Sequence, residues 1–410
     1  MPGDRENVAR GVLRGVVVVS SLQGGDRPPD DEEAPLAEVH GSCDERFAGV
    51  RDALAQRLDG EELGASIAVD LDGKTVVDIW GGYRDPDRTT PWTRDTIVNV
   101  WSTTKTVLSL AALLLVERGE LDVYAPVADY WPEFAAKGKK NIEVRHLMSH
   151  TSGVSGWDTP FSIRDMYDWE SATERLALQR PWWEPGTASG YHSKNQGHLV
   201  GEVIRRITNT TFKKFVADEI AGRLGADFQV GAREADWGRI APVVAPPPEE
   251  EEPLDPDSVR GRTWRGPKSS VKAANSAEWR QADIGALNGH SNARGVLDVL
   301  RVLSLGGAAG GVQLLSPKTI DLVFDQQSDG VDLVLGEPFR FGIGYCLGSP
   351  VVPYVPPGRT FFWGGWGGSM IVMDLDRRLT ISYMMNKMAP GVLGSDRSEA
   401  YVRAVYSSLA

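Results

Sequence analysis

Hydrophobic and polar positions become regular from about residue 44 onward. Apolar residues recur every three or four positions over 47–58, which predicts an amphipathic helix. Two runs rich in β-branched residues follow, at 65–69 and 75–80, with Asp72-Gly73 between them. An Asp-Gly pair between two such runs is typical of a hairpin turn, so we expect the runs to pair as antiparallel strands.

A strongly apolar segment follows at 107–116, where Val, Leu and Ala recur at helical spacing and predict a buried helix. The residues before it, 96–100, are expected to form a short strand. Ser102 therefore lies at or just before the first helical turn, where unpaired backbone N–H groups and the positive end of the helix dipole gather. Lys105 follows one turn later and shares a helix face with Ser102.

The middle of the chain, from about 120 to 290, has mostly helical patterning with long connections. Helices are predicted at 142–148, 161–178, 196–206 and 212–224. The proline-rich, acidic stretch 246–253 is predicted to be a solvated surface loop. Beyond 290 we expect a helix at 293–305, four strands at 341–347, 360–363, 369–374 and 379–386, and a terminal helix at 398–409.

Strands near both ends of the chain enclose a helical block, which indicates an α/β fold of the α+β type. We expect an antiparallel sheet flanked by N- and C-terminal helices, with an inserted, mostly helical lobe. The expected parts are a disordered or leader segment at 1–43, a sheet lobe formed by 44–119 and 290–410, and a helical lobe at 120–289, the two lobes making one domain. A substrate site is expected in a cleft between the lobes.

Composition and charge disfavour several classes of protein, namely nucleic-acid-binding, membrane and metal-binding proteins. The net charge of −12 over 410 residues disfavours nucleic-acid binding, and no apolar run reaches the roughly 18 residues of a membrane helix. The short apolar stretch 16–19 has a basic flank but no convincing cleavage site, so we expect a cytoplasmic protein rather than a secreted one. Cys43 and Cys346 lack metal-ligand spacing. His146 and His150 stand four apart, but no Glu follows the first, and Thr151-Ser152-Gly153 indicates that the helix has ended by the second, so we expect no metal.

The spacing Ser-x-x-Lys can make a serine reactive. A hydroxyl is a poor nucleophile until a neighbouring base takes its proton, and an amine becomes that base only when its pKa is lowered. Burial at the start of an apolar helix supplies both conditions for Ser102 and Lys105. The same spacing recurs at Ser269 and Lys272 without an apolar helix behind it. Taken alone, the spacing therefore favours a helix-capping serine and an exposed lysine, and the apolar helix behind Ser102 is what distinguishes the first pair.

Two further segments carry candidate chemistry. Tyr191 precedes the predicted helix 196–206 and can act as an acid/base partner if a cation lowers its pKa from about 10; otherwise it packs on a loop. The segment Trp363-Gly364-Gly365-Trp366 leads into a predicted strand. Its glycines allow the backbone to approach a ligand closely and offer an N–H to an oxyanion. The alternative is a glycine-rich bend whose tryptophans belong to the core.

Taken together, these motifs resemble those of a known family. Ser102-x-x-Lys105 is followed about 90 residues later by Tyr191-x-Ser193, and a glycine-rich strand lies near the C-terminus. This order resembles the serine β-lactamase and penicillin-binding-protein superfamily, most of all its class-C-like branch and, within it, the family VIII carboxylesterases. The resemblance covers roughly residues 45–408.

The resemblance implies a role for each matching position. Ser102 is expected to be the acylated nucleophile, Lys105 to help deprotonate it, and Tyr191 to pass the proton to the leaving group. The backbone N–H groups of Ser102 and Trp366 are expected to form the oxyanion hole. Whether Lys105 or the tyrosinate is the first base stays open, because the two groups titrate as a coupled pair.

Two departures from the family pattern bear on the substrate. Ser193 stands where β-lactamases usually have Asn, and Trp363-Gly364-Gly365 stands where they have a motif that begins with Lys and a hydroxyl residue. The second change removes a cation and a hydroxyl that hold a β-lactam carboxylate. The indole of Trp363 favours a neutral, apolar ester instead. We therefore expect these four residues to contact the substrate.

The sequence thus predicts a serine hydrolase that cleaves short-chain or aryl carboxylic esters through an acyl-enzyme, without metal or cofactor. Its expected partner is a small-molecule ester, and neither nucleic acid nor membrane. The alternatives are hydrolysis of β-lactams or cephalosporin esters, D-amino-acid peptidase or amidase activity, acyl transfer to a small alcohol, and a non-catalytic binding protein of the same fold. The chain has no Gly-x-Ser-x-Gly pentapeptide, the usual nucleophile elbow of α/β-hydrolases.

Overall fold

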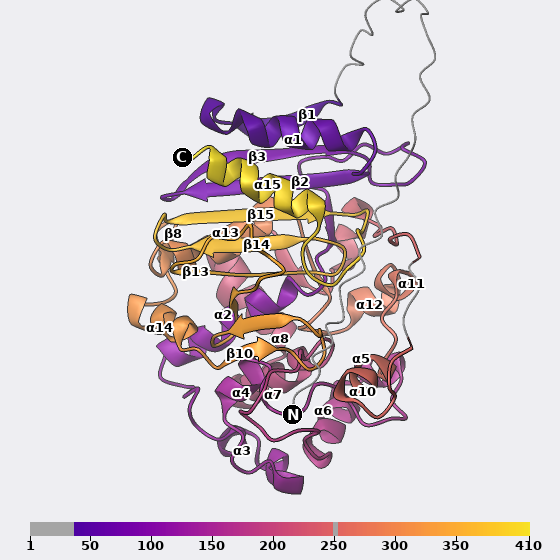
Figure 1. Cartoon of the computed structure of the whole chain (residues 1–410), viewed down its shortest axis with the longest axis vertical. Helices are drawn as coiled ribbons and strands as arrows, with labels where there is room; N and C mark the ends of the chain where they lie inside the picture. Colours follow the sequence, from indigo (N-terminus) through magenta and orange to yellow (C-terminus); the bar gives the residue numbers. More distant parts are fainter. Residues whose placement is uncertain (1–36, 249–252) are drawn as a thin grey trace, which may run out of the picture. The chain divides into compact units, whose positions relative to one another are not determined.

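The computed structural model describes residues 37–248 and 253–410, which belong to one compact unit (Figure 1). Residues 1–36 of the predicted leader and 249–252 of the predicted loop lie outside the described residues. The loop residues beside that gap, Pro247, Pro248 and Pro253, are exposed and have no regular secondary structure, as predicted.

A nine-stranded antiparallel sheet is built from both ends of the chain. Its strands are β1 (Val39–Cys43), β2 (Gly64–Leu71), β3 (Lys74–Gly82), β10 (Ser328–Val331), β11 (Pro338–Phe341), β12 (Cys346–Gly348), β13 (Thr360–Gly364), β14 (Met370–Asp374) and β15 (Leu379–Met385). They lie in the order β1-β3-β2-β15-β14-β13-β12-β11-β10. Because β15 pairs with β2, the N-terminal hairpin and the C-terminal strands share one sheet, as the sequence predicted.

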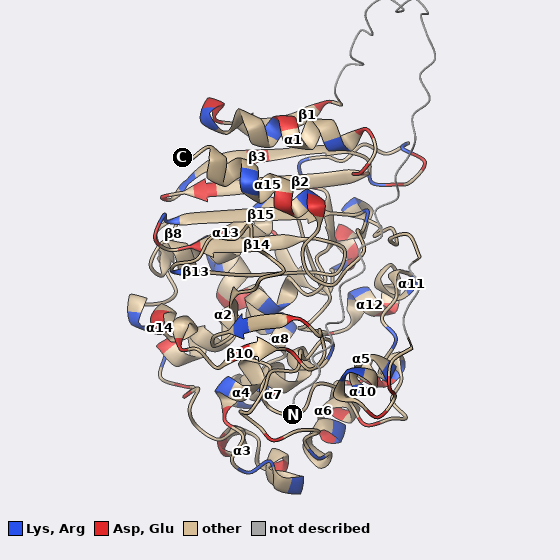
Figure 2. Cartoon of the chain, in the orientation of Figure 1, with Lys and Arg blue, Asp and Glu red and all other residues tan. Residues whose placement is uncertain are grey.

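Helices from both chain ends and from the middle cover the two faces of this sheet (Figure 1). They are α1 (Ala48–Leu58) and α15 (Asp396–Ser407) on one face, and α2 (Thr104–Glu117) and α13 (Ala293–Ser304) on the other. Successive strand residues alternate between the faces, so Ile67 and Val69 of β2 pack with the α1 side while Ala68 packs with the α2 side. Figure 2 shows acidic and basic residues interspersed along α1 and α15.

The inserted region is mostly helical and carries a small sheet. Its helices are α3 (Val127–Tyr130), α4 (Val144–Met148), α5 (Ile163–Tyr167), α6 (Trp169–Leu178), α7 (Gln196–Thr208), α8 (Phe212–Phe215), α9 (Gly222–Leu224), α10 (Val259–Arg265), α11 (Val271–Ala274) and α12 (Ala277–Gln281). The strands β4 (Ile97–Asn99), β5 (Phe228–Val230), β6 (Ile240–Ala241) and β7 (Gly289–Ser291) form a second sheet in the order β5-β7-β4-β6. After α13 come β8 (Ala308–Ala309), β9 (Val312–Gln313) and α14 (Pro317–Asp321).

The predicted boundary between the leader and the structured part, at residue 43, is wrong by several residues. Val39–Cys43 forms β1, which pairs with β3 at the edge of the main sheet, so the structured part begins before residue 44. Three residues of this strand are exposed and its sequence has little apolar patterning. An edge strand is held largely by backbone hydrogen bonds, which side-chain periodicity does not reveal.

Two predicted elements are each divided in two. The predicted helix 161–178 is broken at Asp168, whose extended backbone ends α5 and whose carboxylate accepts a hydrogen bond from Ser171 N–H at the start of α6. The predicted strand 341–347 is instead the end of β11, a turn and the start of β12. Gly344 in that turn has a φ of 88°, a left-handed conformation that favours glycine. The strand β10, which completes this edge of the sheet, was missed.

Candidate active site

Ser102 lies in the turn that joins β4 to α2. Its side chain is nearly buried, with 4% of its surface exposed. The preceding residue, Trp101, has a φ of 49°, a left-handed conformation that is uncommon for a bulky side chain. Strained backbone of this kind persists only where the surroundings hold it, and here β4 is fixed between β6 and β7.

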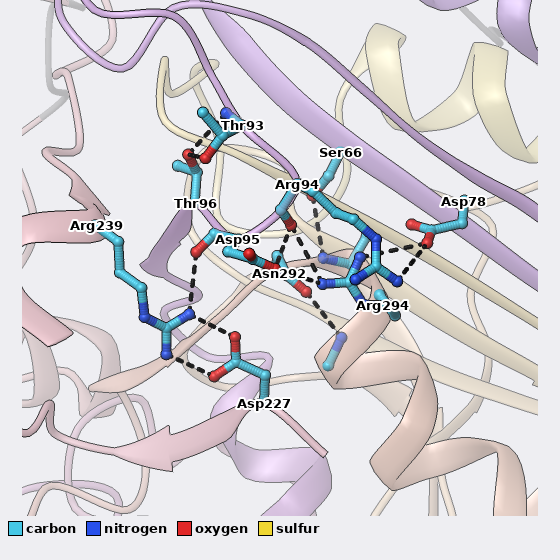
Figure 3. Close-up of polar contacts among 12 residues, drawn as sticks. Ser66, Asp78, Thr93, Arg94, Asp95, Thr96, Asp227, Arg239, Asn292 and Arg294 are labelled. Atoms are coloured by element: carbon cyan, nitrogen blue, oxygen red, sulfur yellow. Dashed lines mark hydrogen bonds and ion pairs between the residues drawn. The ribbon is translucent and has the colours of Figure 1, made fainter. Parts of the chain in front are cut away.

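A polar network holds the segment that leads into β4 (Figure 3). Arg294 at the start of α13 forms ion pairs with Asp78 of β3 at 3.3 Å and with Asp95 at 3.3 Å. Asp95 also accepts, through its backbone carbonyl, a 3.0 Å hydrogen bond from Arg239 Nη1. These contacts join the main sheet, α13 and the small sheet around the entry to Ser102.

Lys105, in the first turn of α2, is held against Ser102. Its Nζ donates hydrogen bonds to Ser102 Oγ at 3.0 Å, to the Ser193 carbonyl at 2.8 Å and to the Ala286 carbonyl at 2.9 Å. All three acceptors are uncharged, and the side chain is 2% exposed. Burial lowers the pKa of Lys105 well below its ordinary value of 10.5. The lowered pKa favours the neutral amine, which keeps two N–H groups for the carbonyls of Ser193 and Ala286 and has a lone pair that can accept a hydrogen bond from Ser102 Oγ.

Tyr191 lies next to the Lys105 amine and the Trp363 indole. The side chain is fully buried, and Lys105 Nζ lies 4.9 Å from the centroid of its ring. Trp363 Nε1 donates a 3.3 Å hydrogen bond to Tyr191 Oη. Burial raises the pKa of the phenol above its ordinary value of 10, although hydrogen bonding from Ser102 and Trp363 acts in the opposite direction. The phenol is therefore neutral and can donate a proton.

The glycine-rich segment after β13 packs directly on the Ser102 turn. A Cβ at Gly365 would lie 2.5 Å from the Val100 carbonyl oxygen, so only glycine fits there. Ser369 Oγ donates a 3.2 Å hydrogen bond to the same carbonyl, and the rings of Trp366 and Trp101 meet edge to face with centroids 5.0 Å apart.

Two backbone amides near this contact have no hydrogen-bond acceptor among the described residues. Within residues 37–248 and 253–410, neither Ser102 N–H nor Trp366 N–H donates to a protein acceptor. The family resemblance implies that these same two amides form an oxyanion hole. Their unpaired state is compatible with that assignment, since an oxyanion would supply the missing acceptor.

The remaining residues that were predicted to bind substrate lie close to Tyr191 or Lys105. Trp363 is 4% exposed and packs on Tyr191, with ring centroids 5.2 Å apart, and on Phe341, at 5.5 Å. Gly364 ends β13 beside it. Ser193 contributes its backbone carbonyl to Lys105, a contact that its side-chain type does not indicate.

Some features near the site carried no sequence signal. The Ala286 carbonyl binds Lys105 across 181 residues of chain, and any residue type has a carbonyl. His150 packs edge to face on Tyr191, with ring centroids 4.9 Å apart. The second Ser-x-x-Lys spacing behaves differently from the first: Lys272 is exposed, and Ser269 Oγ has no hydrogen-bond partner among the described residues.

Elsewhere, a hollow of about 780 Å³ opens beside α5, α6 and α10, lined among others by Phe161 and Arg265, and does not include Ser102, Lys105 or Tyr191. No helix in the described part of the chain has the length and apolar character needed to cross a membrane.

Known proteins with similar sequences and folds are β-lactamase-like proteins and esterases. The Beta-lactamase family model matches residues 50–405. "Esterase/beta-lactamase LipL" of Mycobacterium tuberculosis (strain ATCC 25618 / H37Rv) is 30% identical over 373 residues, covering 88% of this chain and 86% of that protein. A crystal structure of a family VIII carboxylesterase superposes with a TM-score of 0.86 at 35% identity, covering 90% of this chain and 100% of that one. A penicillin-binding protein homologue from Caulobacter crescentus gives 0.84 at 34% identity, covering 90% and 100%.

The chain therefore belongs to the β-lactamase and penicillin-binding-protein-like family of serine hydrolases. The predicted fold class is confirmed: a large antiparallel sheet with flanking terminal helices and a helical insert. The predicted resemblance to family VIII carboxylesterases is confirmed as well.

Proposed function

We propose that this protein is a serine carboxylesterase that cleaves short-chain or aryl esters through an acyl-enzyme on Ser102. The observation that carries the proposal is the contact between Ser102 Oγ and a buried Lys105 amine, with Tyr191 beside both. LipL is named an esterase and the family VIII structure a carboxylesterase, which supports the choice of ester substrates.

In the acylation step, neutral Lys105 takes the proton of Ser102 as Oγ attacks the ester carbonyl. The lowered pKa of Lys105 and the raised pKa of Tyr191 favour the amine, rather than a tyrosinate, as this first base. The amides of Ser102 and Trp366 stabilise the resulting oxyanion; in other acyl-transfer enzymes one such donor contributes on the order of 10²–10³-fold in kcat.

Collapse of the tetrahedral intermediate breaks the bond between the carbonyl carbon and the alcohol oxygen. Tyr191 gives its phenolic proton to the departing alkoxide, and the Lys105 ammonium returns a proton to Tyr191. Water then attacks the acyl-enzyme by the same route in reverse, and the acid and a free Ser102 hydroxyl result.

β-Lactam hydrolysis is the second candidate, because LipL is named an esterase/beta-lactamase. Trp363 disfavours it, since an indole stands where a cation would bind the β-lactam carboxylate. We expect Trp363→Lys to lower turnover of a neutral ester and to raise turnover of an anionic one, measured with p-nitrophenyl butyrate and a p-nitrophenyl ester that carries a free carboxylate. Unchanged selectivity would show that residue 363 does not face the substrate.

The proposed function is tested by comparing the hydrolysis of p-nitrophenyl butyrate and nitrocefin. Faster turnover of the ester supports an esterase, equal or opposite rates favour a β-lactamase, and no turnover of either favours a binding protein.

Ser102→Ala should abolish ester turnover and labelling by a fluorophosphonate while leaving the melting temperature close to that of the wild type, because Oγ is the proposed site of acylation. Mass spectrometry of the labelled protein identifies the modified residue. A label that persists on the Ser102→Ala protein would assign the reaction to another serine.

A further inference from the structure

Asp332 lies next to Tyr191 although 141 residues separate them in sequence. It begins the connection between β10 and β11, and its side chain is fully buried. A single oxygen, Oδ1, accepts three backbone hydrogen bonds: from Tyr191 N–H at 3.0 Å, from Val334 N–H at 2.9 Å and from Leu335 N–H at 2.9 Å. One carboxylate oxygen therefore joins the tyrosine segment to the turn at 332–335.

The same turn is attached to the tyrosine segment at a second point. Leu333 N–H donates a 2.8 Å hydrogen bond to the Ser189 carbonyl. The turn is closed by its own backbone, because Gly336 N–H donates to the Asp332 carbonyl at 2.8 Å and Asp332 N–H donates to the Glu337 carbonyl at 2.9 Å. It is thus a closed unit that is anchored to β10 and β11 of the main sheet.

The other carboxylate oxygen is unusual. Asp332 Oδ2 is buried and has no hydrogen-bond partner among the described residues. Burying a carboxylate with one oxygen unpaired costs free energy, which capping a turn alone does not require. In a surface turn a serine could cap the same amides at lower cost. Burial is the largest cause of the raised pKa of the Tyr191 phenol, and the carboxylate of Asp332 raises it further.

We propose that Asp332 is a positioning residue for Tyr191. It fixes the backbone of the tyrosine, so that the phenol oxygen stays between Trp363 Nε1 and Ser102 instead of moving with its loop. This inference rests on the proposed function, in which Tyr191 protonates the leaving group. A displacement of about 1 Å in a group that acts on the reacting atoms can cost on the order of 10²-fold in rate.

Two substitutions separate positioning from turn formation. Asp332→Asn keeps an acceptor at Oδ1 and should keep kcat for p-nitrophenyl butyrate within about threefold of the wild type. Asp332→Ser has a shorter side chain that can still cap Val334 and Leu335 but does not reach Tyr191 N–H. It should lower kcat by about tenfold or more while KM changes little, because the proton transfer and not ester binding is disturbed.

The pH profile separates the effect of the Asp332 charge from the effect of its hydrogen bonds. Asp332→Asn removes a negative charge beside Tyr191 and so lowers the pKa of the phenol. The alkaline limb of its kcat profile should therefore shift to lower pH, with little change in kcat at the optimum.

Asp374→Ala is the matched control. Asp374 is also fully buried and accepts hydrogen bonds from Arg377 N–H at 3.0 Å and Tyr406 Oη at 3.1 Å, at the end of β14. The Asp374→Ala variant should have a lower melting temperature than the wild type. Its kcat should be unchanged at temperatures where it is folded. Wild-type kcat in Asp332→Ser, or an equal loss of kcat in Asp332→Asn, would overturn the inference. A wild-type protein inactive on esters would instead overturn the proposed function.

Discussion

At the scale of single residues, the proposed chemistry depends on the protonation state of Lys105. Its pKa is lowered because the ammonium has lost its hydration and has only three neutral oxygens as partners. A protonated Lys105 cannot accept the proton of Ser102. Activity should therefore be lost as the pH falls through the lowered pKa of Lys105 and be retained above it.

Lys105→Arg tests this dependence, because a guanidinium stays protonated at every working pH. We expect the variant to be inactive over the whole range, whereas kcat/KM of the wild type rises along an acid limb and reaches a plateau well below pH 10.5. The measurement is a pH profile of kcat/KM with p-nitrophenyl butyrate. An active arginine variant with the same acid limb would contradict the role of Lys105 as the base.

At the scale of secondary-structure elements, the hairpin of β13 and β14 is joined to the start of α2. Gly365 allows this contact, since a Cβ there would meet both the Val100 carbonyl oxygen and Ser369 Oγ at 2.5 Å. The neighbouring amide of Trp366 is one of the two proposed oxyanion donors. Its position relative to Ser102 therefore depends on how closely these two elements approach.

Gly365→Ala should push the elements apart and lower kcat/KM by about tenfold or more, because the Trp366 donor moves away from the developing charge. Gly60→Ala is the matched control, since a Cβ at Gly60 meets no atom within 4 Å. Steady-state kinetics on both variants checks the prediction. Equal activity in the two would show that the Trp366 amide is not used.

At the scale of the whole molecule, a buried ion pair joins the two ends of the described chain. Arg397 of α15 donates to Glu62, before β2, at 2.6 Å and to the Lys387 carbonyl at 2.8 Å. Tyr401 Oη donates a further 3.1 Å hydrogen bond to Glu62. The side chains of Arg397 and Glu62 are both almost fully buried. Removing either one would leave the other as an unpaired buried charge, which would destabilise the fold.

Arg397→Met should lower the free energy of unfolding by about 3–5 kcal/mol, because it leaves the Glu62 carboxylate buried without its cation. Arg403→Met on the same helix breaks a solvent-exposed pair with Glu399 and should cost at most about 1 kcal/mol. Urea unfolding of both variants measures the difference. Similar costs for the two would show that the buried pair contributes no more than a surface pair.

Much of the fold could be predicted from sequence because the repeating signals are local. The hydrophobic period predicted α1, α2, α13 and α15 and most central strands within a few residues of their bounds. The predicted elements are wrong where contacts or single residues outside the hydrophobic pattern determine the structure. β1 is held by pairing with β3, the break at Asp168 depends on one capping side chain, and the turn through Gly344 interrupts a run that reads as a single strand.

The sequence by itself predicted that Ser102 and Lys105 share one face at the start of a helix, and the structure shows the contact between their side chains. The sequence also carried the order of motifs that places the chain in its family. Only the tertiary structure decided that the carbonyls of Ser193 and Ala286 enclose Lys105 and that Trp363 donates to Tyr191. Such contacts join distant segments, often through backbone atoms that every residue has. The folding of the whole chain, and not any local pattern, brings them together.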